Sequence, residues 1–586
     1  MILKNNLNKI SQILLLLLIP LFYLYTETSR KATIAALITT VLITFIYFNF
    51  LTKEDSLNPL EGLLETSKFS KINSKNYLFI YLFLITVLLL ATQNVNLNYE
   101  SIDWDIHSYL VASQEISRGH LPLETQWESK GPLLFYIYNF INIITAKNYF
   151  FFKISNDFIL LFIVLLLSGI IKEKTNSSLK GYFVSALYVL LMSKNFGNLE
   201  YSELYSLLFI AISYLIYLKN ENNKYTPFFV AFFISLSTLV NQGTVLFVIP
   251  YILNLIYKKT RTFAFFHDIS TSFVGFIVPH LFFLVIYSIN NLLDIYYATF
   301  VTIPLGYIGE SFNVLNELVV FLRSYFNFNF LIYFAIICIG VLFFLEKVNS
   351  RVTDNSLINN DFLNNLFILT SIFFYIIGSH GFEHHLIFLV FFVSIMVSQL
   401  ERKSTNIFIG FLISISALSS FQSSFYSSYD NLVNYDETYN NYPLLKLSSQ
   451  IDSYFDSEYT VLALDYVLLL YYLDKPNFSY IVHPTNHYAD FITKELVELN
   501  LIEENNIDEL ICYQREDCEE PDVIICSHRM IISGEVVKNK LFNCMVSDYK
   551  KNYYSIDTEK YTYDKNLSFY FDPYKDIAVF IKDKDI

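Results

Sequence analysis

DWDIHSYLVASQEISRGHLPLETQWESKGPLLF, residues 103–135, is a polar interruption in a chain that is otherwise mostly apolar. It contains both tryptophans of the protein, Trp104 and Trp127. Two closely spaced carboxylates, Asp103 and Asp105, stand at its start. Charged groups at a membrane boundary are costly to desolvate, so they usually pair with one another or carry function. This stretch is therefore the first candidate for a functional loop.

The composition of the 586-residue chain predicts a polytopic α-helical membrane protein. Hydrophobic residues make up 54% of the chain and charged residues only 16%, unlike an ordinary soluble enzyme. Apolar runs such as 13–25 and 158–171 lack a polar face, which is typical of helices that cross a membrane. The net charge of −14, with no basic stripe, argues against a nucleic-acid partner.

The distribution of lysine and arginine predicts which loops face the cytoplasm. Lys4 and Lys9 precede the first apolar run, and basic clusters recur in alternate loops. The run 132–146 is short and begins with proline, and a full crossing there would place the later basic loops outside. We therefore expect this run to lie in the outer membrane interface as an amphipathic helix. The resulting topology has about thirteen transmembrane helices, with the N-terminus in the cytoplasm and the C-terminus outside.

The same pattern divides the chain into three parts. Residues 1–76 are predicted to form an additional transmembrane hairpin with a cytoplasmic loop. Residues 77–424 form the main transmembrane domain, with an external loop at 93–131. Residues 425–586 contain short apolar runs that alternate with helical patches, which predicts a soluble, extracytoplasmic α/β domain.

Cysteine usage supports this topology. Four of the five cysteines fall in the last part of the chain, an even number that favours disulfides in an oxidising compartment. Free buried thiols are the alternative. The four are Cys512, Cys518, Cys526 and Cys544.

The outer loops hold acidic and basic side chains that could form one site. The groups are Asp103, Asp105, Glu128, Lys130, Glu200, Glu203, Asp294, Glu310, Arg323, His380, Glu383, His384 and His385. A carboxylate beside an apolar surface suits a general base, and a cation suits a phosphate leaving group. Structural alternatives exist: Asp103 or Asp105 could cap the helix that begins near Ile106, and Lys130 could lie in a turn at the membrane surface.

The histidines of HGFEHH, residues 380–385, resemble a zinc site by composition. His384 and His385 are adjacent, however, and adjacent side chains diverge on a helix. We therefore do not expect this loop alone to supply three zinc ligands.

Taken as a whole, 103–135 resembles the first external loop of the GT-C-fold glycosyltransferases, in the bacterial branch related to protein O-mannosyltransferases and the lipid A aminoarabinose transferases. That loop has an aspartate, a tyrosine four residues on, a helix with a glycine, and a K-G/P-P-L ending. Asp105 and Tyr109 match the pair, Gly119 matches the glycine, and KGPL at 130–133 matches the ending. The resemblance implies that Asp105 acts as the base at the acceptor.

Two further segments resemble motifs of the same family. GNLEYSELYSLLF, residues 197–209, places Glu203 at the second acidic position. GSHGFEHHLIFLVFF, residues 378–392, places His384 at the position of the family's histidine. Ser379–His380 replaces the family's arginine region, which departs from the pattern for phosphate binding.

The resemblance covers about residues 77–420 and implies an inverting glycosyltransferase that uses a polyprenyl-phosphate-linked sugar and neither a metal nor another cofactor. We assign catalytic roles to Asp105 and Glu203. Substrate-binding roles are assigned to Asp103, Tyr109, Trp127, Lys130, Arg323 and His384. The expected acceptor is a hydroxyl of a lipid, glycan or protein at the outer face of a prokaryotic inner membrane.

Two other functions remain open. A lipid-linked oligosaccharide ligase or polymerase would use similar lipids, but the catalytic loops of such enzymes are typically rich in arginine. The outer loops here hold few arginines, Arg118 and Arg323 among them. A non-catalytic lipid or sugar transporter predicts charged residues inside the spans and an internal repeat, and the sequence shows neither clearly.

Overall fold

The computed structural model describes most of the chain from residue 74 onward. The described residues are 74–98, 100, 103–195, 200–221, 223–258, 263–309, 358–378, 382–399, 427–502, 520–527, 529–532, 535–538, 546–547, 553–554, 561–567 and 577–582. The predicted hairpin at 10–51, the last predicted span at 405–422 and Arg323 lie outside them. The predicted number of thirteen spans therefore stays a prediction.

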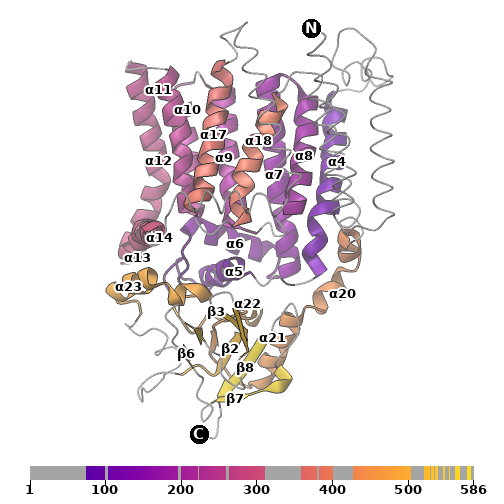
Figure 1. The fold of residues 1–586 in the computed structure, drawn as a ribbon, viewed down its shortest axis with the longest axis vertical. Coiled ribbons are helices and arrows are strands. Elements are labelled where there is room, and N and C mark those ends of the chain that lie inside the picture. Colours follow the sequence, from indigo (N-terminus) through magenta and orange to yellow (C-terminus); the bar gives the residue numbers. More distant parts are fainter. Residues whose placement is uncertain are drawn as a thin grey trace.

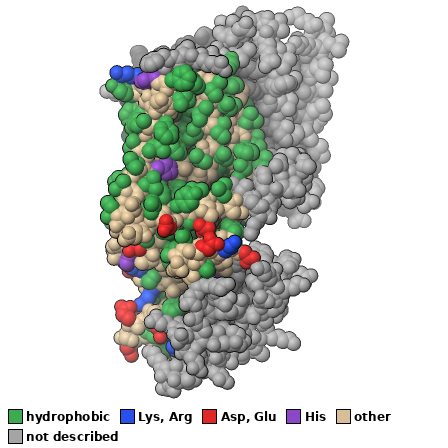
Figure 2. Space-filling model, turned by 90° about the vertical axis from the view of Figure 1, so that its left-hand side faces the viewer, with side chains coloured by type: hydrophobic (Ala, Val, Ile, Leu, Met, Phe, Trp, Pro, Cys, Tyr) green, Lys and Arg blue, Asp and Glu red, His purple; other side chains and the backbone are tan. Residues whose placement is uncertain are grey.

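A bundle of roughly parallel helices forms one half of the molecule (Figure 1). Its helices are α4 (Ser74–Gln93), α7 (Tyr149–Thr175), α8 (Ser178–Asn195), α9 (Ser202–Lys219), α10 (Thr226–Val240), α11 (Val248–Lys258), α12 (Phe263–Ile289), α17 (Ile358–Ile377) and α18 (Ile387–Ser398). Among the described helices, α7, α9 and α12 are long and apolar enough to cross a membrane. Hydrophobic side chains cover the bundle face seen in Figure 2, and charged side chains lie above and below that band. The chain is a membrane protein, as its composition predicts.

Local sequence signals set the ends of α7. The Asn148 side chain accepts a hydrogen bond from the backbone N–H of Phe151 at 3.1 Å and so caps the first turn. At the other end, Asn176 has a φ of 55°, the left-handed conformation that commonly ends helices. Between 158 and 171 the helix has no charged side chain, which suits the interior of a bilayer.

Helices α5 (Trp104–Ser117) and α6 (Pro132–Ile144) lie across the end of the bundle instead of along it (Figure 1). Pro132 occupies the first turn of α6, where its fixed φ suits a helix start. The helix buries Leu134 and Tyr138 and exposes Phe140 and Ile143, so its two faces differ in burial. The prediction that this run lies at the boundary rather than crossing is confirmed by its orientation.

Short helical segments connect the longer helices. They are η2 (Asn94–Asn98), η3 (Gln242–Phe247), α13 (Leu293–Tyr297), the π-helix η4 (Ala298–Thr302), α14 (Ile303–Gly309) and η5 (Glu383–Leu386). Among these, η3 and η5 bring polar residues to the same end of the bundle as α5 and α6.

Residues 427–582, here called the C-terminal region, combine helices with a mixed sheet. Its helices are α20 (Tyr435–Asn440), α21 (Pro443–Tyr454), α22 (Leu468–Leu473), η6 (Pro484–Tyr488), α23 (Asp490–Glu498) and η7 (Lys565–Leu567). Its strands are β1 (Val461–Ala463), β2 (Val523–Ser527), β3 (Arg529–Ile532), β4 (Glu535–Lys538), β5 (Val546–Ser547), β6 (Tyr553–Tyr554), β7 (Tyr561–Tyr563) and β8 (Ile577–Lys582).

The main sheet has the strand order β1-β2-β8-β7. β1 and β2 are parallel, with Val461 opposite Val523, and the other pairs are antiparallel. The apolar runs that predicted strands here do form β1, β2 and β8. Cys526 in β2 is disulfide-bonded, whereas the other three C-terminal cysteines lie outside the described residues.

One hydrophobic core joins the C-terminal region to the helices at the end of the bundle. Ile106 of α5 and Leu134 of α6 belong to the same buried cluster as Leu470 of α22 and Val482. The C-terminal region is therefore packed on α5 and α6 by buried side chains, and apolar burial of this kind is the main favourable term in folding.

Gly131, at the start of α6, lies against the end of α10. A Cβ atom added there would collide with the backbone carbonyl of Leu239, and the Gly131 N–H donates to the Val240 carbonyl at 3.3 Å. The glycine of the KGPL motif is therefore required by the close approach of two backbones.

Replacing Gly131 with alanine should destabilise the protein by about 1–3 kcal/mol, because the added methyl group must displace the backbone of α10. Thermal unfolding of the purified protein in detergent measures this loss. The Gly169→Ala variant is the control, because its methyl group would meet only Leu215 side-chain carbons at 3.6 and 3.7 Å, an ordinary contact. Equal unfolding temperatures for both variants would contradict the packing argument.

Candidate active site

Five segments bring polar side chains together where the bundle meets the C-terminal region. They are the start of α5, the loop 127–131, the start of α9, η5, and the residues that lead into η6. The side chains that these segments contribute are Asp103, Asp105, Glu128, Lys130, Tyr201, Glu203, His384, His385 and His483. Figure 2 shows acidic side chains gathered at this level of the molecule.

Asp103 begins helix α5. Its carboxylate accepts a hydrogen bond from the backbone N–H of Ile106 at 3.2 Å, so it is the N-cap residue, the structural role that the sequence left open. The Tyr201 hydroxyl donates to its other oxygen. Burial and the neighbouring Asp105 carboxylate raise the pKa of Asp103. Both oxygens of Asp103 are thus engaged in holding α5 to the start of α9.

Asp105 lies two residues after Asp103, in the first turn of α5, and has a different environment. His483 Nε2 donates to its Oδ1 at 2.9 Å, and the two form an ion pair when the imidazole is protonated. The other oxygen, Oδ2, has no hydrogen-bond partner among the described residues, and the side chain is 36% exposed. Although burial opposes it, the hydrogen bond and charge of His483, together with Lys130, lower the pKa of Asp105. Asp105 is therefore an ionised carboxylate with one accessible oxygen.

Glu128 and Lys130 flank Asp105 from the loop before α6. Glu128 is buried, its Oε1 accepts from the backbone N–H of Ser129 at 2.8 Å, and its Oε2 has no partner within the described part of the chain. Burial raises the pKa of Glu128. The Lys130 ammonium lies 5.9 Å from the centre of the Tyr109 ring. Lys130 is the one lysine or arginine that the described residues contribute to this group.

Glu203 lies at the first turn of α9 and is fully buried. Its Oε1 accepts a hydrogen bond from the Asn241 amide at 2.9 Å and lies 3.5 Å from His385 Nε2. Asn241 ends α10 and caps η3, so the residue that joins these two helices also holds Glu203. His384 stacks on the Tyr201 ring, with 4.0 Å between ring centres.

One group of described side chains has the composition of a metal site. Glu203, His384 and His385 each offer a ligand atom, and the three atoms lie within 4.8 Å of one another. Two imidazoles and a carboxylate are a donor set that suits a divalent cation such as zinc. Two of these ligand atoms come from η5 and the carboxylate comes from α9. Because His380 lies outside the described residues, the expectation that this loop alone does not supply three zinc ligands stays a prediction. The absence of a metal in the reaction stays a prediction.

The two aromatic residues that were assigned to substrate binding are fully buried. Trp127 has no exposed surface and donates from Nε1 to the Thr299 hydroxyl at 3.0 Å. The Tyr109 ring packs edge-on against Tyr138. Direct contact between substrate and either ring is therefore not expected, and both side chains instead hold the loop and α5 in place.

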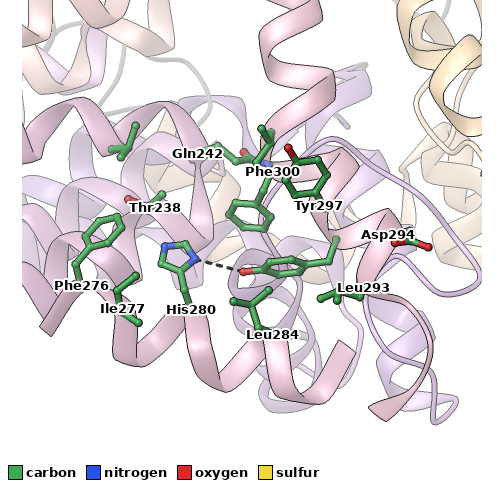
Figure 3. Close-up of a pocket in the computed structure, with 13 residues that line it drawn as sticks. Thr238, Gln242, Phe276, Ile277, His280, Leu284, Leu293, Asp294, Tyr297 and Phe300 are labelled. Carbon is green, nitrogen blue, oxygen red and sulfur yellow. Dashed lines mark hydrogen bonds between the residues drawn. The ribbon is translucent and has the colours of Figure 1, made fainter. Parts of the chain in front are cut away.

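A cavity of about 550 Å³ opens beside this site, between α10, η3, α12 and α13 (Figure 3). Its wall is mostly apolar, and His280 Nδ1 lies 3.3 Å from the Tyr296 hydroxyl within it. Gln242 forms part of the wall, and its amide donates to the carbonyls of Ser129 at 3.1 Å and Thr299 at 3.2 Å. The cavity therefore adjoins the loop that carries Lys130.

The sequence reasoning missed two residues of this group, Tyr201 and His483. Tyr201 lies within the recognised segment 197–209, at the N-cap position of α9 and two residues before Glu203. His483 is 378 residues from Asp105 in the chain, in an apolar run followed by proline. No periodicity or motif connects His483 to the first loop.

Comparisons with known proteins identify the fold. No family model matches the chain, and no curated protein matches it. The structure resembles that of ArnT from Cupriavidus metallidurans bound to undecaprenyl phosphate, with a TM-score of 0.53 and 10% identity over 78% of this chain and 94% of ArnT. The comparison with the apo form of ArnT gives a TM-score of 0.51 and 9% identity, over 78% of this chain and 93% of ArnT. The likeness to the archaeal oligosaccharyltransferase AglB from Archaeoglobus fulgidus is weaker, with a TM-score of 0.43. The identity is 10%, over 78% of this chain and 70% of AglB.

At such low identity these likenesses concern the fold. The protein shares with ArnT the GT-C fold of membrane glycosyltransferases, which its first-loop motif predicts.

Proposed function

We propose that the protein is a glycosyltransferase that moves a sugar from a polyprenyl-phosphate-linked donor to an acceptor hydroxyl at the outer face of the membrane. The observation that carries the proposal is Asp105, an ionised carboxylate with one accessible oxygen beside Lys130. A base and a cation at adjacent positions are the groups that such a transfer needs. ArnT, which has the same fold, was seen bound to undecaprenyl phosphate.

In the proposed reaction the acceptor oxygen attacks the anomeric carbon of the donor sugar. The bond between that carbon and the phosphate oxygen breaks, and its electron pair leaves with the polyprenyl phosphate. The acceptor proton passes to Oδ2 of Asp105, and from there to solvent. Attack from the face opposite the leaving group inverts the anomeric configuration.

Lys130 has the task of stabilising the charge that develops on the departing phosphate. Asp103, Asp105, Glu128 and Glu203 make the site rich in acidic groups, which would repel an anion. Because Lys130 is the one fixed cation that the described residues place there, the phosphate depends strongly on it. His384, beside Tyr201, is placed to add a hydrogen bond to the sugar or the phosphate.

Glu203 has a supporting role in this scheme. Its carboxylate is buried and already bound to Asn241, so it is better placed to orient a neighbouring group than to accept the proton. The apolar cavity beside α12 suits the isoprenoid chain of the donor, since Gln242 links the cavity wall to the loop of Lys130.

The Asp105→Asn variant should lose about 10²–10⁴-fold in transfer rate, because the amide keeps the shape of the side chain but cannot take the proton. Transfer from a radiolabelled polyprenyl-phosphate sugar in membranes measures the loss. Asp103→Asn is the matched comparison, since asparagine caps helices as well as aspartate does, and it should lose about tenfold or less. A normal turnover in Asp105→Asn would reject Asp105 as the base.

The Lys130→Met variant should reduce kcat by about 10²–10³-fold, because the charge on the leaving phosphate then lacks its cation. Lys130→Arg should recover part of this rate, because arginine restores the positive charge but carries it on a planar guanidinium and not on a compact ammonium. Lys147→Met removes an exposed lysine that pairs with Asp474 away from the site, and it should transfer normally. If Lys147→Met lost as much transfer rate as Lys130→Met, the loss would reflect the reduced positive charge of the protein and not a contact between Lys130 and the phosphate.

A reporter that is active only outside the cytoplasm, fused after residue 430, should be active in cells. This outcome follows from the positive-inside rule applied to the loops. A fusion of the same reporter after residue 174, which follows Lys172 at the other end of α7, should be inactive. The reverse pattern would move the proposed site to the cytoplasmic face.

A further inference from the structure

We propose that the C-terminal region takes part in the transfer reaction by supplying His483, a positioning residue that holds Asp105 in the geometry for proton acceptance. This inference rests on the proposed function, since it concerns the base of that reaction. It makes the C-terminal region a component of the active site, whereas the sequence offered no motif for its role.

The contact between His483 and Asp105 is short, sheltered and specific. His483 Nε2 and Asp105 Oδ1 are 2.9 Å apart, and the imidazole is only 10% exposed. The hydrogen bond engages one carboxylate oxygen and leaves Oδ2 accessible. A carboxylate held in this way presents a single oxygen to an incoming hydroxyl, which is the arrangement that favours proton transfer in a positioned site.

The surroundings of His483 orient its ring. Nδ1 accepts a hydrogen bond from the backbone N–H of Thr485 at 3.3 Å, so a neutral ring carries its proton on Nε2, facing Asp105. The Trp104 ring lies edge-on to the imidazole, with 6.3 Å between ring centres. The Trp104 Nε1–H donates in turn to Asp465 at 2.8 Å. Both the tautomer and the orientation of His483 are therefore set by neighbours.

Backbone pairing brings His483 to Asp105 in a fixed register. The N–H of Trp127 donates to the Tyr480 carbonyl at 2.7 Å, and the N–H of Val482 donates to the Trp127 carbonyl at 3.2 Å. Gln126 extends the pairing, because its Oε1 accepts from the backbone N–H of Asn477 at 2.9 Å. The first loop and the segment that carries His483 thus adjoin each other as paired strands do.

The charge of the pair fits this role. Although burial opposes it, Asp105 and Glu128 raise the pKa of His483, while His483 lowers that of Asp105. The ionised form of Asp105 is thereby favoured before the acceptor arrives. The charged and titratable groups that face the pair among the described residues are Asp103, Tyr109, Glu128, Lys130, Tyr201, His384, His385 and His487.

The test compares His483→Ala, His483→Gln and Tyr480→Phe in the full-length protein, with the labelled donor used above. His483→Ala should lower kcat by about 10–100-fold with little change in KM, because the base is misplaced while donor binding is intact. Glutamine can donate an N–H to Asp105, so His483→Gln should recover most of that loss. In His483→Ala the acidic limb of the kcat profile should move up in pH toward the ordinary aspartate value of about 3.9.

Tyr480→Phe is the matched control for docking of the C-terminal region. It removes the hydrogen bond from the Tyr480 hydroxyl to the Leu123 carbonyl, 2.6 Å long, at the same junction but away from Asp105. We expect a kcat within about twofold of wild type, and unfolding temperatures of all variants within a few degrees of it.

The outcomes separate the two proposals. A wild-type protein that transfers no sugar from any polyprenyl-phosphate donor rejects the proposed function itself. An active wild type with a folded His483→Ala variant of normal kcat and normal pH profile rejects the role of His483. Equal losses in His483→Ala and Tyr480→Phe, or no recovery in His483→Gln, also overturn it, since docking alone would then explain the effect.

Discussion

Two backbone hydrogen bonds, between Trp127 and the residues at 480 and 482, hold the first external loop to the C-terminal region. They are buried with the Trp127 ring, in a place where an unmade backbone hydrogen bond would be costly. In the first loop, this pairing positions Glu128 and Lys130, which closely follow Trp127. In the C-terminal region, it positions His483, which directly follows Val482. The site therefore depends on an interaction between two segments that are more than 350 residues apart in sequence.

The sequence allowed the class of the fold to be predicted because lipid and water sort residues strongly. Apolar runs predicted the helices of the bundle, and the alternation of basic loops predicted that 132–146 would not cross, which α6 confirms. Strands at 461, 523 and 577 were also expected from short apolar runs. The glycine in KGPL is explained only by the structure, since its need arises from the backbone of α10.

Part of the site could be predicted, and part could not. The first loop placed Asp105 and Lys130 within one polar stretch, and the acidic segment of α9 pointed to Glu203. Asp103 lies two residues before the proposed base, and its two oxygens accept from Ile106 and Tyr201, a distinction that spacing cannot show. His483 was missed because its partner is set by tertiary pairing, which leaves no periodic trace in a single sequence.

The order of the strands has a consequence for the time at which the site is completed. β8 is the last strand of the described chain, and it pairs with β2 on one side and β7 on the other. β2 also pairs with β1. In β1 the backbone N–H of Ala463 donates a hydrogen bond to the Asn477 side chain, which lies close in sequence to His483. A ribosome adding 5–20 residues per second makes His483 roughly 20–80 s after Asp105, because 378 residues separate them, and the inner strand β8 comes later still. For the greater part of synthesis the first loop therefore exists without the segment that carries His483.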